Sequence, residues 1–253
     1  MEQFLKTPFL PEKRVSHVIV DGRVSSSIIS SLHELGIDTI LTPALASLYP
    51  SVRCHPDMLI HPIGDDIVVA APDVYDLFKP LLMPLKIKLI RGKTYIKSNY
   101  PESIAYNVAR INNVAFHNIT YTDPVVRDYL EQKNVRMINV KQGYAKCSVC
   151  IVNEHAIITS DRGIANAADT YNLDVLLIRP GYILLPGLNY GFVGGATGLI
   201  ARNQLAAAGS LNKHPDFTDI VDFCSKYNVE ILSLGDEELI DIGSIIPIKY
   251  KHG

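Results

Sequence analysis

The sequence predicts an α/β protein in which five similar units surround a common centre. A stretch with helical periodicity, a short turn and an apolar strand that carries a charge near its start recur at intervals of about 40 to 55 residues, a range typical of radial repeats and solenoids. The five strands begin in segments 36–41, 84–89, 134–138, 172–177 and 228–232. Because remote parts of the chain converge at such a centre, a functional site there would combine side chains from several units.

Each unit begins with a helix signal. The predicted helices cover residues 28–35, 74–82, 125–133, 163–171 and 217–227. Ser25 can cap the first helix, which Gly36 ends. Asp123-Pro124 supplies a cap followed by a proline at the first helical position, and Asp161 can cap the fourth helix. Asp73 precedes the second helix in the same way.

Hairpins follow the first four helix–strand pairs, because short polar turns separate pairs of apolar runs. The expected pairs are 58–61 with 67–71, 104–110 with 114–117, 147–152 with 155–159 and 194–201 with 204–208. The fifth unit has one further strand, 239–248, and the unassigned strand 16–20 can pair with it. The sequence therefore predicts a five-bladed αβ-propeller of repeated β-α-β hairpin units, closed by the N-terminal strand, as one domain over residues 1–253. The alternative is an ordinary two-layer α/β domain whose repeat spacing is coincidental.

Composition restricts the class of protein. The net charge is −2 and no block of Lys and Arg stands out, which argues against nucleic acid as a partner. No secretory signal or membrane-length apolar run is evident, and four cysteines do not make a disulfide framework. We therefore expect a cytoplasmic protein that binds a small molecule, and leave its oligomeric state open.

The residues at the start of each first hairpin strand are expected to face the centre. They are His55-Pro56-Asp57, Glu102-Ser103, Lys146-Cys147-Ser148, Gly194 to Thr197 and Glu238 to Asp241. A thiol beside an imidazole can act as a nucleophile, and the imidazole can then protonate a leaving amine. Carboxylates can hold a planar cation through paired hydrogen bonds.

Two short motifs resemble the pentein fold of guanidino-group-modifying enzymes, which include arginine deiminases, amidinotransferases and dimethylarginine hydrolases. His55-Pro56-Asp57 before an apolar run is similar to that superfamily's His-x-Asp strand, and Gly143 to Cys150 is similar to its approach to the nucleophilic cysteine. The repeat pattern covers nearly the whole chain, which also resembles an uncharacterised bacterial family that shares this fold. The chain departs from the enzymes in two ways: the cysteine lies mid-chain, as in a circular permutation, and the Glu-Gly-Gly-Asp strand has no clean counterpart.

The resemblance implies a role for each candidate. Cys147 would be the nucleophile, His55 the general acid and base, and Asp241 the acid that orients it. The substrate-binding candidates implied by the fold or by position are Asp57, Glu102, Gly195 and Thr197. No metal and no organic cofactor are implied.

Structural readings of the same residues remain open. Cys147 can be an inert buried thiol, and His55 a hydrogen-bonded structural residue. Glu102 can be a solvated loop charge, and Asp57 can cap a turn. The pair Cys147 and Cys150 lacks the second pair that a zinc site needs and the helix start of a redox motif. The glycines of segment 191–198 lack the Gly-Lys-Ser/Thr ending of a phosphate loop.

Two functions follow from this reading. The first is a hydrolase or transferase that acts on a guanidine or amidine compound through a Cys-His-carboxylate site. The alternative is a non-catalytic module of the same fold that binds a small molecule or a protein, since a ribosome anti-association factor shares the fold without chemistry.

Overall fold

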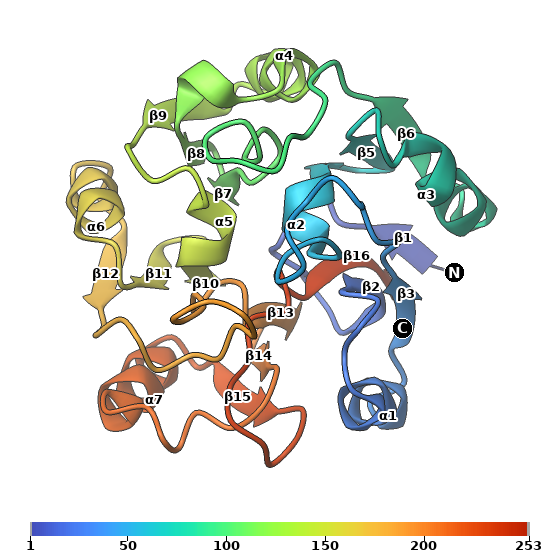
Figure 1. Ribbon diagram of the computed structural model, residues 1–253. Helices are drawn as coiled ribbons and strands as arrows, with labels where there is room; N and C mark the ends of the chain where they lie inside the picture. The colour runs from blue at the N-terminus through green and yellow to red at the C-terminus, as the bar shows by residue number, and fades with distance from the viewer. Residues whose placement is uncertain (1, 252–253) are drawn as a thin grey trace.

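The computed structural model describes residues 2–251 as a mixed α/β structure with five small sheets. Figure 1 shows the sheets side by side around a common centre, with the long helices at the periphery. The sheets, each with its outer helix, are β1 (Glu2–Phe4), β16 (Ile246–Lys251), β2 (Val15–Val20) and β3 (Asp38–Leu41) with α1 (Ser26–Glu34); β4 (Ile60–Gly64), β5 (Ile67–Ala70) and β6 (Lys88–Arg91) with α3 (Tyr75–Leu82); β7 (Ala109–Ile111), β8 (Val114–His117) and β9 (Arg136–Asn139) with α4 (Pro124–Gln132); β10 (Val149–Asn153), β11 (Ala156–Thr159) and β12 (Asp174–Leu177) with α6 (Arg162–Asp169); and β13 (Thr197–Ala201), β14 (Gln204–Ala207) and β15 (Glu230–Ser233) with α7 (Phe217–Lys226).

Every sheet has the same internal order. An antiparallel hairpin comes first, the chain then forms the outer helix, and the third strand returns parallel to the second. The sheet of β2 follows this rule only if β16 is its first strand, and β16 does pair antiparallel with β2. The predicted pairing of the N-terminal strand with the last segment is therefore confirmed.

One backbone feature repeats in all five units, directly after each outer helix or its 3-10 extension. The residue there has a positive φ: Gly36, Lys86, Asn134, Asn172 and Asn228. The next residue donates its N–H back to a carbonyl near the helix end, as Val135 does to Leu130. This is the hydrogen bond of a Schellman cap, which explains why glycine and asparagine recur at this position.

Several strand predictions were wrong in part. Of the predicted strands 104–110 and 194–201, only the parts within β7 (Ala109–Ile111) and β13 (Thr197–Ala201) are strand. Residues 56–59 and 145–148 form single helical turns, α2 (Pro56–Leu59) and α5 (Ala145–Ser148), before their strands begin. Pro56 fits the start of a helix, where its missing N–H costs nothing. Segment 239–248 is not one strand: Gly243 and Ser244 have φ of +67° and +79°, so the chain turns before β16. In addition, strand β1, which pairs with β16, was not foreseen.

The outer helices were placed correctly, but one cap was misjudged. Ser25 and Asp161 accept backbone N–H groups of their helices, and Asp123 accepts two. Asp73 does not cap α3 and instead accepts the N–H of Ile96, in a loop of another part of the chain.

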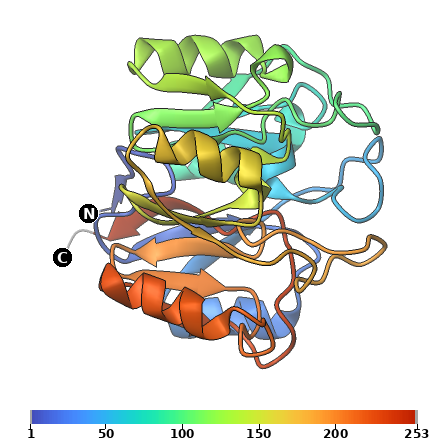
Figure 2. The same ribbon diagram turned by 90° about the vertical axis from the view of Figure 1, so that its left-hand side faces the viewer.

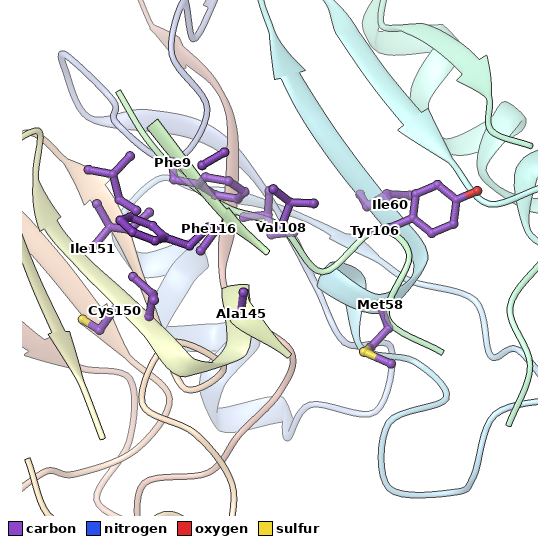
Figure 3. Packing of buried hydrophobic residues seen from close by; sticks show 14 of the residues in the cluster. Phe9, Met58, Ile60, Tyr106, Val108, Phe116, Ala145, Cys150 and Ile151 are labelled. Atoms are coloured by element: carbon purple, nitrogen blue, oxygen red, sulfur yellow. The ribbon is translucent and has the colours of Figure 1, made fainter. Parts of the chain in front are cut away.

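The core lies between the sheets and their helices and continues into the centre. Figure 3 shows Phe9 among these buried side chains, together with Met58 on α2 and Ala145 on α5. Figure 2 shows the long loops projecting at one end of the molecule, while the start of β1 and the end of β16 lie at the opposite end. No helix in residues 2–251 is both long enough and apolar enough to cross a membrane.

Candidate functional site

The short helices α2 and α5 bring the predicted nucleophile against an acid. The Sγ of Cys147 lies 3.1 Å from Oδ2 of Asp57, in a hydrogen bond that the thiol donates. Both residues are buried, with Cys147 4% exposed. The helical turns explain this contact, because each ends at the start of an innermost strand, β4 or β10, near the centre.

Asn107, in the segment that leads into β7, holds the thiol from another unit. Its Nδ2 donates to Cys147 Sγ at 3.1 Å and to the carbonyl of Asp57 at 3.2 Å. Its Oδ1 accepts the backbone N–H groups of Lys146 and Cys147, at 2.8 and 3.2 Å. One buried amide therefore fixes both the start of α5 and the position of the sulfur.

The pKa of the Cys147 thiol is raised well above its ordinary value. Burial is the main cause, and the charges of Asp57 and Asp241 and the hydrogen bond to Asp57 act in the same direction. The hydrogen bond from Asn107 opposes them. Without a ligand, the sulfur is therefore a protonated thiol at neutral pH.

His55 lies between two buried acids. Its Nδ1 is 3.7 Å from Asp241 Oδ1, and its Nε2 is 3.8 Å from Asp21 Oδ2. Nδ1 is buried and has no hydrogen-bond partner within the described part of the chain. Gly243 packs so closely that an added Cβ would lie 2.3 Å from the Cβ of His55. The imidazole ring is thus held in place, and its Nδ1 is left without a hydrogen-bond partner in the described residues.

Asp241 is held by backbone groups. Its Oδ2 accepts the N–H of Phe192 and its Oδ1 that of Gly243, both at 2.9 Å. Burial raises the pKa of this carboxyl, while the charge of His55 opposes the rise. An added Cβ on Gly195 would lie 2.0 Å from Asp241 Oδ1, so glycine is needed there for the acid to fit.

A buried lysine lies beneath these acids. Lys146 Nζ donates to Ser244 Oγ at 2.9 Å and to the carbonyl of Gly194 at 3.2 Å. Ser244 Oγ in turn lies 2.7 Å from the same Asp57 oxygen that accepts the thiol. Burial lowers the pKa of Lys146, and the negative charge of Asp57 opposes that shift.

A cavity of about 390 Å³ opens beside the site, and Asp21 and Asp241 form part of its wall. Its other lining side chains include Val24, Ile28 and Ile240, so a polar edge faces an apolar wall. Arg23 also lines it, but its guanidinium is bound to both carboxylate oxygens of Asp21.

Aromatic side chains from four loops adjoin the site. The hydroxyls of Tyr49 and Tyr144 lie 3.4 Å apart, and Tyr144 also bonds Ser103 at 3.1 Å. The Tyr144 ring packs on Tyr100 and Phe192, with centroids 5.6 and 6.4 Å away. Burial raises the pKa of Tyr49, and smaller contributions come from Cys147 and Asp241, which indicates that this group lies near the thiol.

Some predicted site residues gather and others do not. The donor atoms of His55, Asp57 and Cys147 all lie within 4.8 Å of one another. The backbone of Gly195 joins the parts of the site, since its N–H bonds the carbonyl of Cys147 and its carbonyl accepts the N–H of Ser244. Although the spacing of the three side chains would suit a metal, Cys147 and Asp57 already bond each other, and we assign no metal.

Two candidates have other partners. Glu102 lies on an exposed loop and forms an ion pair with Lys97 at 2.5 Å, so it is not part of this cluster. Thr197 is buried, and its hydroxyl donates to the carbonyl of Val193 at 2.7 Å rather than to the centre.

Sequence reasoning missed three residues of the cluster, Asn107, Ser244 and Asp21, and it placed Lys146 at the centre without giving it a role. Asn107 follows Glu102 by five positions, and the expected strand start at Glu102 was placed too early. Asp21 directly follows the strand 16–20, where a polar residue at the end of a buried strand was an available signal.

Comparison with solved structures gives the fold. DDAH from Pseudomonas aeruginosa, a Cys-to-Ser mutant complexed with citrulline, is 7% identical with a TM-score of 0.56, covering 87% of this chain and 92% of that one. Agmatine deiminase from C. jejuni, also a Cys-to-Ser mutant and with substrate bound, is 9% identical with a TM-score of 0.60, covering 99% of this chain and 97% of that one. Inosamine-phosphate amidinotransferase from Streptomyces griseus is 10% identical with a TM-score of 0.55, covering 91% of each chain.

These similarities show that the protein has the pentein fold and is distant in sequence from these structures. Over residues 19–246 the sequence matches the family described as "Family of unknown function (DUF6873)", and the chain belongs to it. A comparison with curated proteins gives no match.

Proposed function

We propose that the protein is a pentein-type enzyme that acts on a guanidine or amidine compound. The convergence of Cys147, His55 and Asp57 within 4.8 Å carries this proposal. Asp57 Oδ1 and His55 Nδ1 are both buried without a partner in the described residues, which is costly unless a ligand pairs with them. The similar structures include guanidino-modifying enzymes, which supports the proposal by analogy of fold.

The proposed chemistry has two halves. With the substrate bound, the Cys147 thiol gives its proton to His55. The thiolate then attacks the central carbon of the amidine, and the C=N electron pair moves to nitrogen. The intermediate then expels an amine, to which His55 gives a proton, and leaves a thiouronium-type adduct on the sulfur. In hydrolysis, His55 takes a proton from water, which attacks the adduct; the C–S bond breaks and the thiol is restored. An amine in place of water gives transfer.

In this proposal the acids hold the substrate. Asp57 Oδ1 accepts an N–H of the cation on one side, and Asp241 does so on the other. The bound positive charge also lowers the pKa of the adjacent thiol, whose proton can leave only at high pH in the free protein. The thiol is then activated by the substrate that it attacks.

The architecture proposed with this function is a single domain, residues 1–253, in which the five sheets act as the blades of an αβ-propeller closed by the β2–β16 pair. The active site then lies where the innermost strands begin.

Labelling with chloroacetamidine tests the proposal. The cationic reagent should alkylate Cys147 faster than neutral iodoacetamide does, relative to the rates of the two reagents with a free thiol. Mass spectrometry should locate the adduct. Cys147→Ala should abolish labelling, whereas Cys150→Ala, which removes another buried thiol, should retain it. Equal labelling of Cys147→Ala would reject the assignment. Release of ammonia from arginine, agmatine, creatine-like and amidine compounds then identifies the substrate.

One observation favours a non-catalytic binding module instead: the thiol is buried and protonated in the free protein. In that case a cationic ligand would bind equally well to the wild type and to Cys147→Ala, and no compound would be turned over. Binding with turnover that disappears in Cys147→Ala would identify the enzyme.

A further inference from the structure

A buried chain of hydrogen bonds joins an ammonium group to the proposed nucleophile. It runs from Lys146 Nζ to Ser244 Oγ at 2.9 Å, then to Asp57 Oδ2 at 2.7 Å, which also accepts the thiol of Cys147 at 3.1 Å. All four residues are at most 4% exposed. Their elements are α5, α2 and the turn before β16, so this chain joins three units.

Ser244 occupies its place at a conformational cost. Its φ of +79° lies in the left-handed region, which is unfavourable for a residue other than glycine. Glycine would adopt this backbone freely. The side chain at this position is a hydroxyl with three polar partners: Lys146 Nζ, Asp57 Oδ2 at 2.7 Å and the carbonyl of Gly194 at 2.9 Å.

Lys146 has no direct acidic partner. In residues 2–251 no carboxylate lies within 4.0 Å of its Nζ, which bonds only Ser244 Oγ and the Gly194 carbonyl and lies 5.2 Å from the centroid of the Phe9 ring. A buried ammonium needs a compensating anion. Through Ser244, the nearest one is Asp57.

We propose that Lys146 and Ser244 are positioning residues that fix Asp57 against the thiol and stabilise negative charge on the Asp57–Cys147 pair. With Ser244 and Cys147 both donating to Oδ2, only Oδ1 of Asp57 remains open, and a substrate cation meets that oxygen. This inference rests on the proposed role of Cys147, but its first test needs no substrate.

Several charged or titratable groups face the thiol. They are Asp57 and His55 from the start of α2, Lys146 on α5, Asp241 in the turn before β16, and Tyr49 in a covering loop. Lys146 is the one whose protonated form adds a fixed positive charge beside the Asp57–Cys147 pair. Removing that charge disfavours the thiolate, so the titration of Cys147 must move to higher pH.

Thiolate absorbance in the ultraviolet measures this titration, with the Cys147→Ser form of each variant subtracted. Lys146→Met should raise the midpoint for Cys147 by about one pH unit or more, a tenfold effect on the ionisation constant. Lys249→Met is the matched control, because Lys249 is also buried and lies 4.7 Å from the centroid of the Phe4 ring, but on β16 beside Glu2. An unchanged or lower midpoint in Lys146→Met, or an equal shift in Lys249→Met, would overturn the role of the ammonium.

Ser244→Gly tests the hydroxyl without straining the fold, since glycine suits the positive φ. It should reduce the rate ratio of chloroacetamidine to iodoacetamide at Cys147 about tenfold, the effect expected when a charge-assisted hydrogen bond that orients Asp57 is lost. Ser148→Ala, which removes a neighbouring buried hydroxyl with no partner in residues 2–251, should keep the wild-type ratio. A wild-type ratio in Ser244→Gly would reject the role of Ser244. A wild-type protein with no preference for the cationic reagent would reject the proposed substrate class and leave the titration test intact.

Discussion

Asn107 shows how one neutral side chain can fix a nucleophile. It donates to the sulfur of Cys147 and accepts two backbone N–H groups of α5. Its amide dipole points a donor at the atom that must become negative, which lowers the pKa of the thiol without adding a charge.

We expect Asn107→Ala to slow alkylation of Cys147 at pH 8 about tenfold, through a further rise of the thiol pKa by about one unit. The N–H groups of Lys146 and Cys147 lose their acceptor, so unfolding free energy should also fall by about 1–3 kcal/mol. Asn189→Ala, on an exposed loop, is the control for both measurements. An alkylation rate at the wild-type level would show that the amide does not tune the thiol.

At this scale the sequence was informative for residues inside a motif and silent for those outside it. The His-x-Asp motif and the approach to Cys147 placed His55, Asp57 and Cys147 correctly near one another. Ser244 and Asn107 carry no local signature, because an isolated serine or asparagine in an irregular segment has many uses. Ser244 lies in a turn with left-handed backbone, and Asn107 is held by hydrogen bonds outside regular secondary structure. Hydrophobic periodicity encodes neither feature.

At the scale of the elements, the segment 191–197 wraps around Asp241 and depends on its glycines. Gly191 and Gly195 both lie against this acid, and a Cβ on either would come within 2.4 Å of its side chain. These glycines therefore let the backbone approach a carboxylate closely.

Gly195→Ala should displace Asp241 and lower the unfolding free energy by about 1–3 kcal/mol, since overpacking of a filled site costs this much. Labelling by chloroacetamidine should fall with it. Gly163→Ala is the contrasting variant: it lies in α6, its added Cβ would meet only Asp161 Oδ1 at 3.1 Å, and helix propensity favours alanine by roughly 1 kcal/mol. Urea denaturation compares them, and equal stability of the two variants would contradict this account.

The helices were easier to predict than the inner strands. Caps such as Asp123 and the residue after each helix are local signals that survive in any tertiary context. Strands β4 and β10 are buried on both faces along nearly their whole length, so their sequences do not reveal where a helical turn ends and the strand begins. Because of that ambiguity, α2 and α5 were not predicted from the sequence.

At the scale of the whole molecule, buried histidines couple stability to pH. Burial lowers the pKa of His61 to about 3 and that of His117 to about 4, from an ordinary value of 6.5. The unfolded chain therefore binds protons below pH 6.5 that the folded chain does not, and stability is lost as pH falls from 6.5 toward 4. Each such histidine contributes a slope of about 1.4 kcal/mol per pH unit. Asp241, whose pKa is raised in the folded protein, has the opposite effect on stability: its contribution increases as pH falls.

His61→Phe should lower the number of protons taken up on unfolding between pH 6 and 4.5 by about one, and the slope of stability against pH should fall accordingly. Its Nε2 has no partner within residues 2–251 and its ring already packs edge-on against Phe9, so an apolar ring fits the environment. Unfolding in urea at several pH values measures the slope, with His155→Gln on the surface as control. The same slope in His61→Phe as in the wild type would show that His61 is not neutral in the folded protein.

The sheet that unites β16 with β1, β2 and β3 has a consequence for biosynthesis. Its first three strands in chain order leave the ribosome long before β16, and so do Asp57 and Cys147, whereas Asp241 and Ser244 are synthesised much later, just before β16. A nascent or prematurely terminated polypeptide therefore lacks an acid and a hydroxyl of the cluster, and its sulfur is not yet enclosed. The cluster can thus be complete only after Asp241 and Ser244 have been synthesised.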